Sequence, residues 1–317
     1  NYNTEQWPIA NWGADELTYC ALFFHPTLDV ARAQWRAAEA NGEASTARPL
    51  PNVNSSIARS DRANGDINPF AYGLSIDIPI ETASKRDIRI ENAQHLSEAA
   101  KLEIAQAAWQ LRSQVIQSYD EYQLNQQQIR LLTEEDYRQK EIVAMYQKRV
   151  SLGAASNVEL SLAKLRQQTT STELNNKLKY REVLIAQLAG NLGLPVSKVQ
   201  ALQIGKANDT QTSSAQSIDA FQQLSASELQ SSALLNRLDI RIALEKYAAA
   251  ESKLKLEIAK QYPDIVLSPG YIYEFGDRVW SLGLSGLLNI LTKNKLAIKE
   301  ATQLREVEIA QFEALQT

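Results

Sequence analysis

The chain has 317 residues and a net charge of −4, from 33 basic and 37 acidic side chains. This balance provides no basic stripe for nucleic acid and no polybasic patch for a membrane surface. The single cysteine, Cys20, excludes an internal disulfide and argues against a thiolate metal site, so we expect a packing residue there.

The N-terminal part predicts a helix after a polar extension. Residues 1–13 lack the basic-then-apolar order of a secretory signal. Apolar side chains from Leu17 to Ala38 recur at helical spacing, so residues 14–48 are expected to form one helix, ended by nearby prolines. No apolar run reaches the roughly 18 residues that a membrane-spanning helix needs.

Two strands should follow, over residues 51–61 and 70–80, which make a hairpin over 51–80. In the second strand large apolar side chains occupy every other position: Phe70, Tyr72, Leu74, Ile76, Ile78 and Ile80. A period of two places all of them on one face of a sheet. A polar loop with the turn signal Asn64-Gly65 joins the two strands.

Residues 83–151 contain neither proline nor glycine and predict one helix about 100 Å long. A helix of this length needs coiled-coil-like neighbours, and its seam of alanines allows close approach. The sequence Leu152-Gly153 then breaks the helix. Ser156 and Glu159 have the spacing of a capping box, which starts a return helix over 156–191.

The chain repeats this order. Leu17, Leu22 and Ala31 recur as Leu229, Leu234 and Ala243, about 212 residues later, and Tyr72 recurs as Trp280. We therefore expect an internal tandem repeat, with repeat 1 over 14–195, a polar linker over 196–224 and repeat 2 over 225–317. Repeat 2 would hold a helix to about 261, a hairpin over 263–290 and the start of a long helix. It would be truncated, so the chain would be about two-thirds of the whole protein.

The strands favour a membrane barrel. Their apolar and aromatic side chains alternate with small or polar ones, as lipid outside and water inside require. An amphipathic hairpin on a soluble core would show the same alternation, but strands of about 10–12 residues suit a membrane crossing better. Four strands leave two open edges, so closure would need other copies: three copies give about 12 strands, and two give about eight.

Three stretches carry a family resemblance: HPTLDVARA at 25–33, YQKRVSLGAAS at 146–156 and LAGNLG at 188–193. In this order and spacing the chain resembles the TolC-type outer-membrane efflux proteins. The segment 78–82, followed by Lys85-Arg86, is also similar to the CzcC-like branch that exports heavy-metal cations.

The resemblance implies a mainly α fold with a β-barrel portion. Three subunits would form a 12-stranded barrel in the outer membrane of a Gram-negative bacterium, with a helical barrel in the periplasm. Its function would be a passive export duct of a tripartite efflux or secretion system. The partners would be a homotrimer, outer-membrane lipid, a periplasmic adaptor and an inner-membrane pump.

The resemblance also implies two sets of site residues. The residues expected to dock the adaptor are those of the hairpin tip: Arg149, Val150, Ser151, Leu152, Gly153 and Ser156. The lipid-facing residues are Phe70, Tyr72, Leu74, Ile76, Ile78, Tyr271, Tyr273, Trp280, Leu282 and Leu284. For the tip, the alternative is that Gly153 only permits the turn and Ser156 only caps a helix.

No residue pattern points to catalysis, so we expect no enzyme, no cofactor and no metal site. His25 and His95 are expected to be solvated or capping groups, and Glu134-Glu135-Asp136 a solvated acidic run. The alternative function is a soluble periplasmic coiled-coil adaptor or scaffold. Such a protein should have polar residues where Leu74, Ile76, Leu282 and Leu284 stand.

Overall fold

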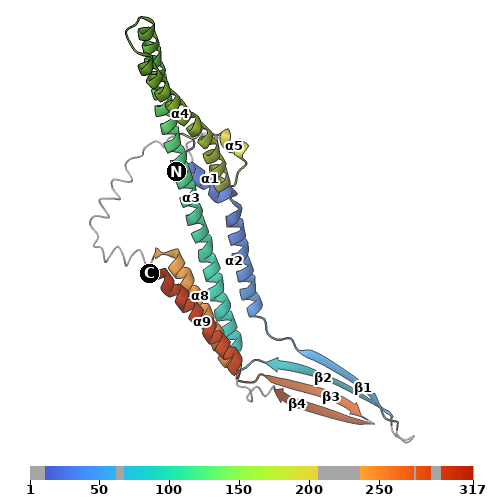
Figure 1. Ribbon diagram of the computed structural model, residues 1–317. Helices are drawn as coiled ribbons and strands as arrows, with labels where there is room; N and C mark the ends of the chain where they lie inside the picture. Colours follow the sequence, from blue (N-terminus) through green and yellow to red (C-terminus); the bar gives the residue numbers. More distant parts are fainter. Residues whose placement is uncertain (1–10, 62–67, 206–235, 275, 287–293, 317) are drawn as a thin grey trace, which may run out of the picture. The chain divides into compact units, whose positions relative to one another are not determined.

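The computed structural model describes residues 11–61, 68–205, 236–274, 276–286 and 294–316 (Figure 1). Over these ranges the chain is mostly helical, with one small antiparallel sheet. It divides into two compact units. The first comprises Asn1–Val30 and Gln106–Ser225, and the second comprises Ala31–Ala105 and Ala226–Thr317.

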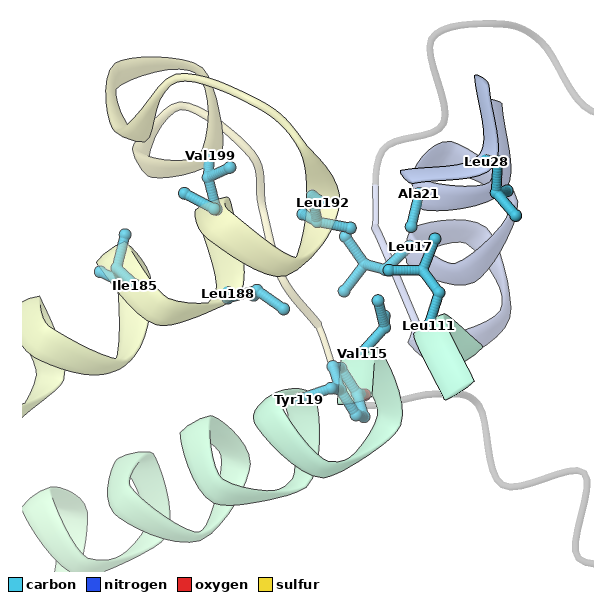
Figure 2. Packing of buried hydrophobic residues seen from close by; sticks show 11 residues of the cluster. Leu17, Ala21, Leu28, Leu111, Val115, Tyr119, Ile185, Leu188, Leu192 and Val199 are labelled. Carbon is cyan, nitrogen blue, oxygen red and sulfur yellow. The ribbon is translucent and has the colours of Figure 1, made fainter. Parts of the chain in front are cut away.

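The first unit is a helical assembly with a hydrophobic core. It contains α1 (Ala14–Phe24), the C-terminal part of α3 (Lys85–Ser151), α4 (Asn157–Leu192) and the short α5 (Val196–Gln200). Its core is made of aliphatic side chains and one tyrosine: Leu17, Ala21, Leu28, Leu111, Val115, Tyr119, Ile185, Leu188, Ala189, Leu192 and Val199. Figure 2 shows these side chains gathered into one cluster; Leu28 lies at the start of α2 (Pro26–Ser45), and the others come from α1, α3, α4 and α5.

The predicted single helix over 14–48 was wrong in one respect. Two helices occupy this range, α1 and α2 (Pro26–Ser45), and His25 between them has extended backbone (φ −76, ψ 124). Pro26 explains the break, because a proline removes one N–H and disfavours helical backbone in the residue before it. The apolar spacing continues through the break, so periodicity alone did not reveal it.

The segment after α4 is more ordered than the linker predicted over 196–224. Gly193 ends α4 with left-handed backbone (φ 67), and α5 follows at once. Ile204 then forms a bridge with Trp12, whose N–H donates to the carbonyl of Gln203 at 2.9 Å. The rest of the predicted linker, and the predicted start of repeat 2, lie outside the described residues.

The second unit carries the sheet. Its strands are β1 (Asn52–Arg59), β2 (Phe70–Ile80), β3 (Ile265–Glu274) and β4 (Asp277–Gly286), close to the predicted ranges. All pairs are antiparallel and the order is β1-β2-β3-β4, so pairing of β2 with β3 joins the two hairpins. Neither hairpin is therefore a sheet by itself. Each outer strand, β1 and β4, has one edge without a partner among the described residues.

Helices continue the chain at one end of this sheet. They are α2, the start of α3, α8 (Leu238–Ala259) and α9 (Lys295–Gln316), so the order helix–hairpin–helix occurs twice along the chain. The start of α3 is tied to α8 by Asn92, whose side chain donates to the carbonyl of Ala249, and by an ion pair of Glu103 with Lys246 at 2.7 Å. Among the described helices, none is both long enough and apolar enough to span a membrane.

Candidate functional site

One face of the sheet is apolar and exposed. The register places large side chains from all four strands on this apolar face: Val53, Ile57, Phe70, Tyr72, Leu74, Ile76, Ile78, Ile80, Ile265, Leu267, Tyr271, Tyr273, Trp280, Leu282 and Leu284. The exposed fractions of Trp280, Leu282 and Leu284 are 81%, 72% and 73%. An uncovered apolar surface that extends over four strands marks an interaction site.

All ten predicted lipid-facing residues lie on this apolar face, where Tyr271 and Tyr273 are half-buried and the other eight are exposed. The two apolar residues of β1, Val53 and Ile57, were missed. In β1 only these two positions are large and apolar among asparagines and serines, so the alternation was too weak to detect. Pairing with β2 is what assigns them to this face.

Aromatic residues are confined to one end of the apolar face. Phe70, Tyr72, Tyr273, Tyr271 and Trp280 occupy the rows next to the strand-connecting loops, which we call the loop end of the sheet. Tyr72 lies opposite Tyr273, and the rings of Tyr271 and Trp280 meet edge to face at 4.9 Å. The rows nearer the helices, the helix end, are aliphatic. Aromatic side chains in a band at one end are typical of a membrane–water interface.

The opposite face, which we call the small-residue face, is lined mainly by serine, glycine and asparagine. Three glycines lie directly across from serines: Gly73 from Ser56, Gly270 from Ser75 and Gly283 from Ser268. A Cβ built on Gly283 would lie 3.2 Å from the Cβ of Ser268, and one built on Gly270 3.3 Å from the Cβ of Ser75.

Ordinary cross-strand Cβ pairs are about 4.5–5.5 Å apart. The close approach at Gly270 and Gly283 therefore means that a side chain on either residue would crowd the serine across from it. Glycine permits this close approach because it has no Cβ.

A polar joint fixes the helix end of the sheet to the start of α3. The buried ammonium of Lys85 donates to the carbonyl of Tyr262 at 2.6 Å and to a carboxylate oxygen of Asp264 at 2.7 Å. The N–H of Thr82 donates to the same oxygen of Asp264. Burial raises the pKa of Asp264, but the hydrogen bonds from Lys85 and Thr82 outweigh it and leave that pKa below its ordinary value.

In the first unit, α3 and α4 meet at the predicted hairpin tip. Gly153 has left-handed backbone (φ 75), its N–H donates to the carbonyl of Val150 at 3.0 Å, and the N–H of Ala154 donates to the carbonyl of Arg149 at 2.8 Å. This is the Schellman arrangement that ends a helix at a glycine. Ser156 then caps α4, since its hydroxyl accepts from the N–H of Glu159, whose carboxylate accepts from the N–H of Ser156.

The structure therefore supports the structural role for Gly153 and the predicted capping box at Ser156. It also exposes the tip: Arg149, Ser151, Leu152, Gly153 and Ser156 are exposed, and Val150 is half-buried. Leu152 is 74% exposed, a large apolar side chain at the apex of the turn. Hydrogen bonds with the Ser156 N–H and hydroxyl lower the pKa of Glu159, which therefore stays ionised at neutral pH.

Two expectations about charged residues were wrong. His95 is neither solvated nor a cap, since its Nδ1 lies 2.7 Å from a carboxylate oxygen of Glu245 on α8. Asp136 is buried rather than solvated, because Lys140 and Gln167 bind its carboxylate at 2.6 and 2.9 Å. His25 is a local cap as predicted, with Nδ1 accepting from the N–H of Thr27.

Cys20 is only half-buried, and burial raises the pKa of its thiol. Within the described residues, no group of three or more histidine, cysteine, aspartate or glutamate side chains could hold a metal ion.

Comparison with known proteins identifies the family. Residues 17–193, more than half of the chain, match the sequence profile described as "Outer membrane efflux protein". The chain belongs to the outer membrane efflux protein family. The predicted resemblance to the TolC-type efflux proteins is thereby confirmed.

One relative is similar in sequence over part of its length. The cobalt-zinc-cadmium resistance protein CzcC of Cupriavidus metallidurans is 24% identical over 198 residues, which are 62% of this chain and 44% of CzcC. The chain therefore spans less than half the length of this relative.

Solved structures of outer-membrane proteins share the fold. The outer-membrane channel OprN matches 95% of this chain and 70% of its own, with 19% identity and a TM-score of 0.74. VceC of Vibrio cholerae matches 98% of this chain and 78% of its own, with 18% identity and a TM-score of 0.73. This chain thus shares its fold, mostly helical with a small antiparallel sheet, with these two outer-membrane proteins.

Proposed function

We propose that this chain is part of a subunit of a trimeric outer-membrane channel that exports its cargo passively. The observation that carries the proposal is the four-stranded sheet, which has an exposed apolar face and two outer edges that no other described strand pairs with. Hydrocarbon does not tolerate unpaired backbone groups at a sheet edge, so a lipid-embedded sheet must be closed by further strands. Three copies would supply about 12 strands, enough for a water-filled lumen.

The two faces of the sheet support this arrangement. The apolar face suits contact with lipid, and the small-residue face, lined mainly by serine, glycine and asparagine, suits contact with water. In this proposal the internal repeat provides one hairpin per repeat, and the helices continue from the barrel into the periplasm.

A soluble adaptor or scaffold is the alternative. It would need polar residues, or a covering element, at Leu74, Ile76, Leu282 and Leu284. The exposed fractions of these side chains lie between 41% and 73%, and no described segment covers them. A water-soluble protein would therefore carry a large exposed apolar patch, which disfavours this alternative.

The decisive experiment is purification of the full-length protein from membranes in detergent, with its mass and its single-channel conductance as readouts. We expect a mass of three subunits and a large, water-filled conductance in planar bilayers. A water-soluble monomer without conductance would refute the channel. The similarity to CzcC makes cobalt, zinc and cadmium ions the first cargo to test, in cells challenged with each salt.

We further propose that the hairpin tip docks a periplasmic adaptor, which links the channel to an inner-membrane pump. Leu152 at the apex is exposed and apolar, and the guanidinium of Arg149 lies 5.8 Å from the ring centre of Tyr146, so the tip presents one apolar and one cationic group. We expect Arg149→Glu to lower export while channel abundance in membranes stays unchanged.

Arg166→Glu, an exposed arginine on α4 away from the turn, is the matched control for Arg149→Glu. Cross-linking of the tip to the adaptor should fall with Arg149→Glu and persist with the control. Unaltered export and cross-linking in Arg149→Glu would exclude this role for the tip.

A further inference from the structure

Two arginines flank the aromatic band at the loop end of the apolar face. Arg59 is the last residue of β1 and pairs with Phe70, and Arg278 is the second residue of β4 and pairs with Tyr273. The register therefore puts both guanidinium groups on the apolar face, although every other residue of that face within the strands is uncharged. The guanidinium of Arg59 lies 5.9 Å from the ring centre of Phe70.

Neither arginine is neutralised by the part of the chain that the structure describes. Both side chains are exposed, and no described carboxylate lies within ion-pair distance of either guanidinium. The nearest acidic residues along β4 and β3 are Asp277 and Glu274, which point to the small-residue face because successive strand residues alternate. Two cations thus remain on an otherwise apolar surface, beside the band of aromatic rings.

Arg59 and Arg278 lie on the two outer strands, so assembly of a barrel would make them neighbours across the seam between two subunits. In a barrel of three copies, β4 of one subunit lies beside β1 of the next, because these strands hold the open edges. Arg278 of one copy and Arg59 of the next copy would then stand on adjacent strands, at the same end and on the same outward face. Neighbouring side chains on adjacent strands are about 5–8 Å apart, so both guanidinium groups can reach one tetrahedral anion.

We propose that Arg59 and Arg278 form a binding site for the phosphate of an outer-leaflet lipid, one site at each seam between subunits. The proposal rests on the channel function proposed above. Charge complementarity identifies the phosphate, since arginine binds phosphate oxygens bidentately. The surrounding aromatic and apolar residues identify a lipid as its carrier, because arginine beside an aromatic band extends to the headgroups while its stem stays in the apolar layer. Bound in this way, the lipid would hold two subunits together.

The test uses the full-length trimer in a neutral maltoside detergent and measures its dissociation temperature while diphosphoryl lipid A is titrated as the probe. For the native protein we expect the dissociation temperature to rise with lipid A. In the double variant Arg59→Gln/Arg278→Gln, we expect the half-maximal lipid A concentration to rise at least about tenfold, because removal of each charged hydrogen-bond donor weakens phosphate binding by about that factor or more. The control Arg166→Gln should behave as the native protein.

Further measurements distinguish the phosphate of a lipid from free phosphate and control for misfolding of the variants. Inorganic phosphate at equal concentration should give no comparable rise; if it gave the full effect, the lipid source would be wrong. The variants Arg59→Lys and Arg278→Lys keep the charge but lose the bidentate geometry, and should weaken lipid binding less than glutamine. A conducting native trimer that does not respond to lipid A would overturn this site and leave the channel intact, whereas a water-soluble monomer would overturn both.

Discussion

Substitution of Leu282 by arginine tests whether the apolar face contacts lipid. On this face the rows run from Phe70 at the loop end to Ile80 at the helix end, the two ends of the 11-residue strand β2. At about 3.4 Å per residue this distance is roughly 34 Å along the strand. With a strand tilt of about 40°, it gives a band roughly 26 Å tall, close to the apolar band of about 25 Å in outer-membrane barrels.

The row in which a residue lies sets its depth in the bilayer, and therefore the free-energy cost of placing an arginine there. The middle of the band lies near residue 75, so the row of Ile76 and Leu282 is close to the bilayer midplane, and the row of Ile78 and Leu284 is about 8 Å away from it. An arginine at the midplane costs about 2–4 kcal/mol, and the cost falls to about 0–1 kcal/mol near the interfaces. We therefore expect Leu282→Arg to cost about 2–4 kcal/mol, and Leu284→Arg about 1–2 kcal/mol.

The assay is the free energy of unfolding of the full-length protein in lipid vesicles, from urea titration monitored by tryptophan fluorescence. Val279→Arg is the matched control, because Val279 is an exposed apolar residue on the small-residue face of the same strand. Its arginine would point into the aqueous lumen and should cost little. Equal costs for Leu282→Arg and Val279→Arg would refute the assignment of the two faces to lipid and water.

Three further predictions concern stability, measured as the free energy of unfolding. Leu188→Ala removes a fully buried side chain from the core of the first unit and should cost about 2–5 kcal/mol; a loss under about 1 kcal/mol would mean that the core of the purified protein is packed differently. Gly193→Ala forces a Cβ onto left-handed backbone (φ 67) and should cost about 1–3 kcal/mol, whereas Gly190→Ala, a helical site with no atom within 4 Å of the new Cβ, should be neutral or slightly stabilising; equal effects would contradict the αL cap. Asp264 has a folded-state pKa below its unfolded value of about 3.9, so its bond with Lys85 stabilises the fold fully above about pH 4 and is lost as the pH falls through the folded pKa. The difference in unfolding free energy between the native protein and Asp264→Asn should therefore shrink in that acid range. If this difference did not change with pH, the bond with Lys85 would not contribute to stability.

Local patterns predicted most of the elements. The uninterrupted run of 83–151 became α3, the alternation from Phe70 to Ile80 became β2, and Ser156 with Glu159 became a capping box. Each of these signals lies within a few residues of sequence, where helix or strand geometry directly fixes which side chains are neighbours. Pro26 was such a local signal too, and the break at His25 could have been read from it.

Interactions between segments far apart in the sequence could not be predicted from such local patterns. Asp136 is buried because Gln167 approaches it from α4, and His95 is paired because Glu245 lies on α8, 150 residues later in the chain. Val53 and Ile57 are assigned to the apolar face only by the register of β1 on β2. None of these partners is near in sequence, so neither periodicity nor composition contains the information.

The sequence by itself determined the long helices, the strands with one apolar side and the family to which the chain belongs, because these depend on local side-chain order. The tertiary structure alone decided that the two hairpins pair as one sheet, whose outer edges have no partner among the described residues, and that Arg59 and Arg278 stand on the apolar face. The physical reason is that strand pairing is set by backbone hydrogen bonds between residues far apart in the chain, which brings together side chains whose order along the sequence does not show that they will meet.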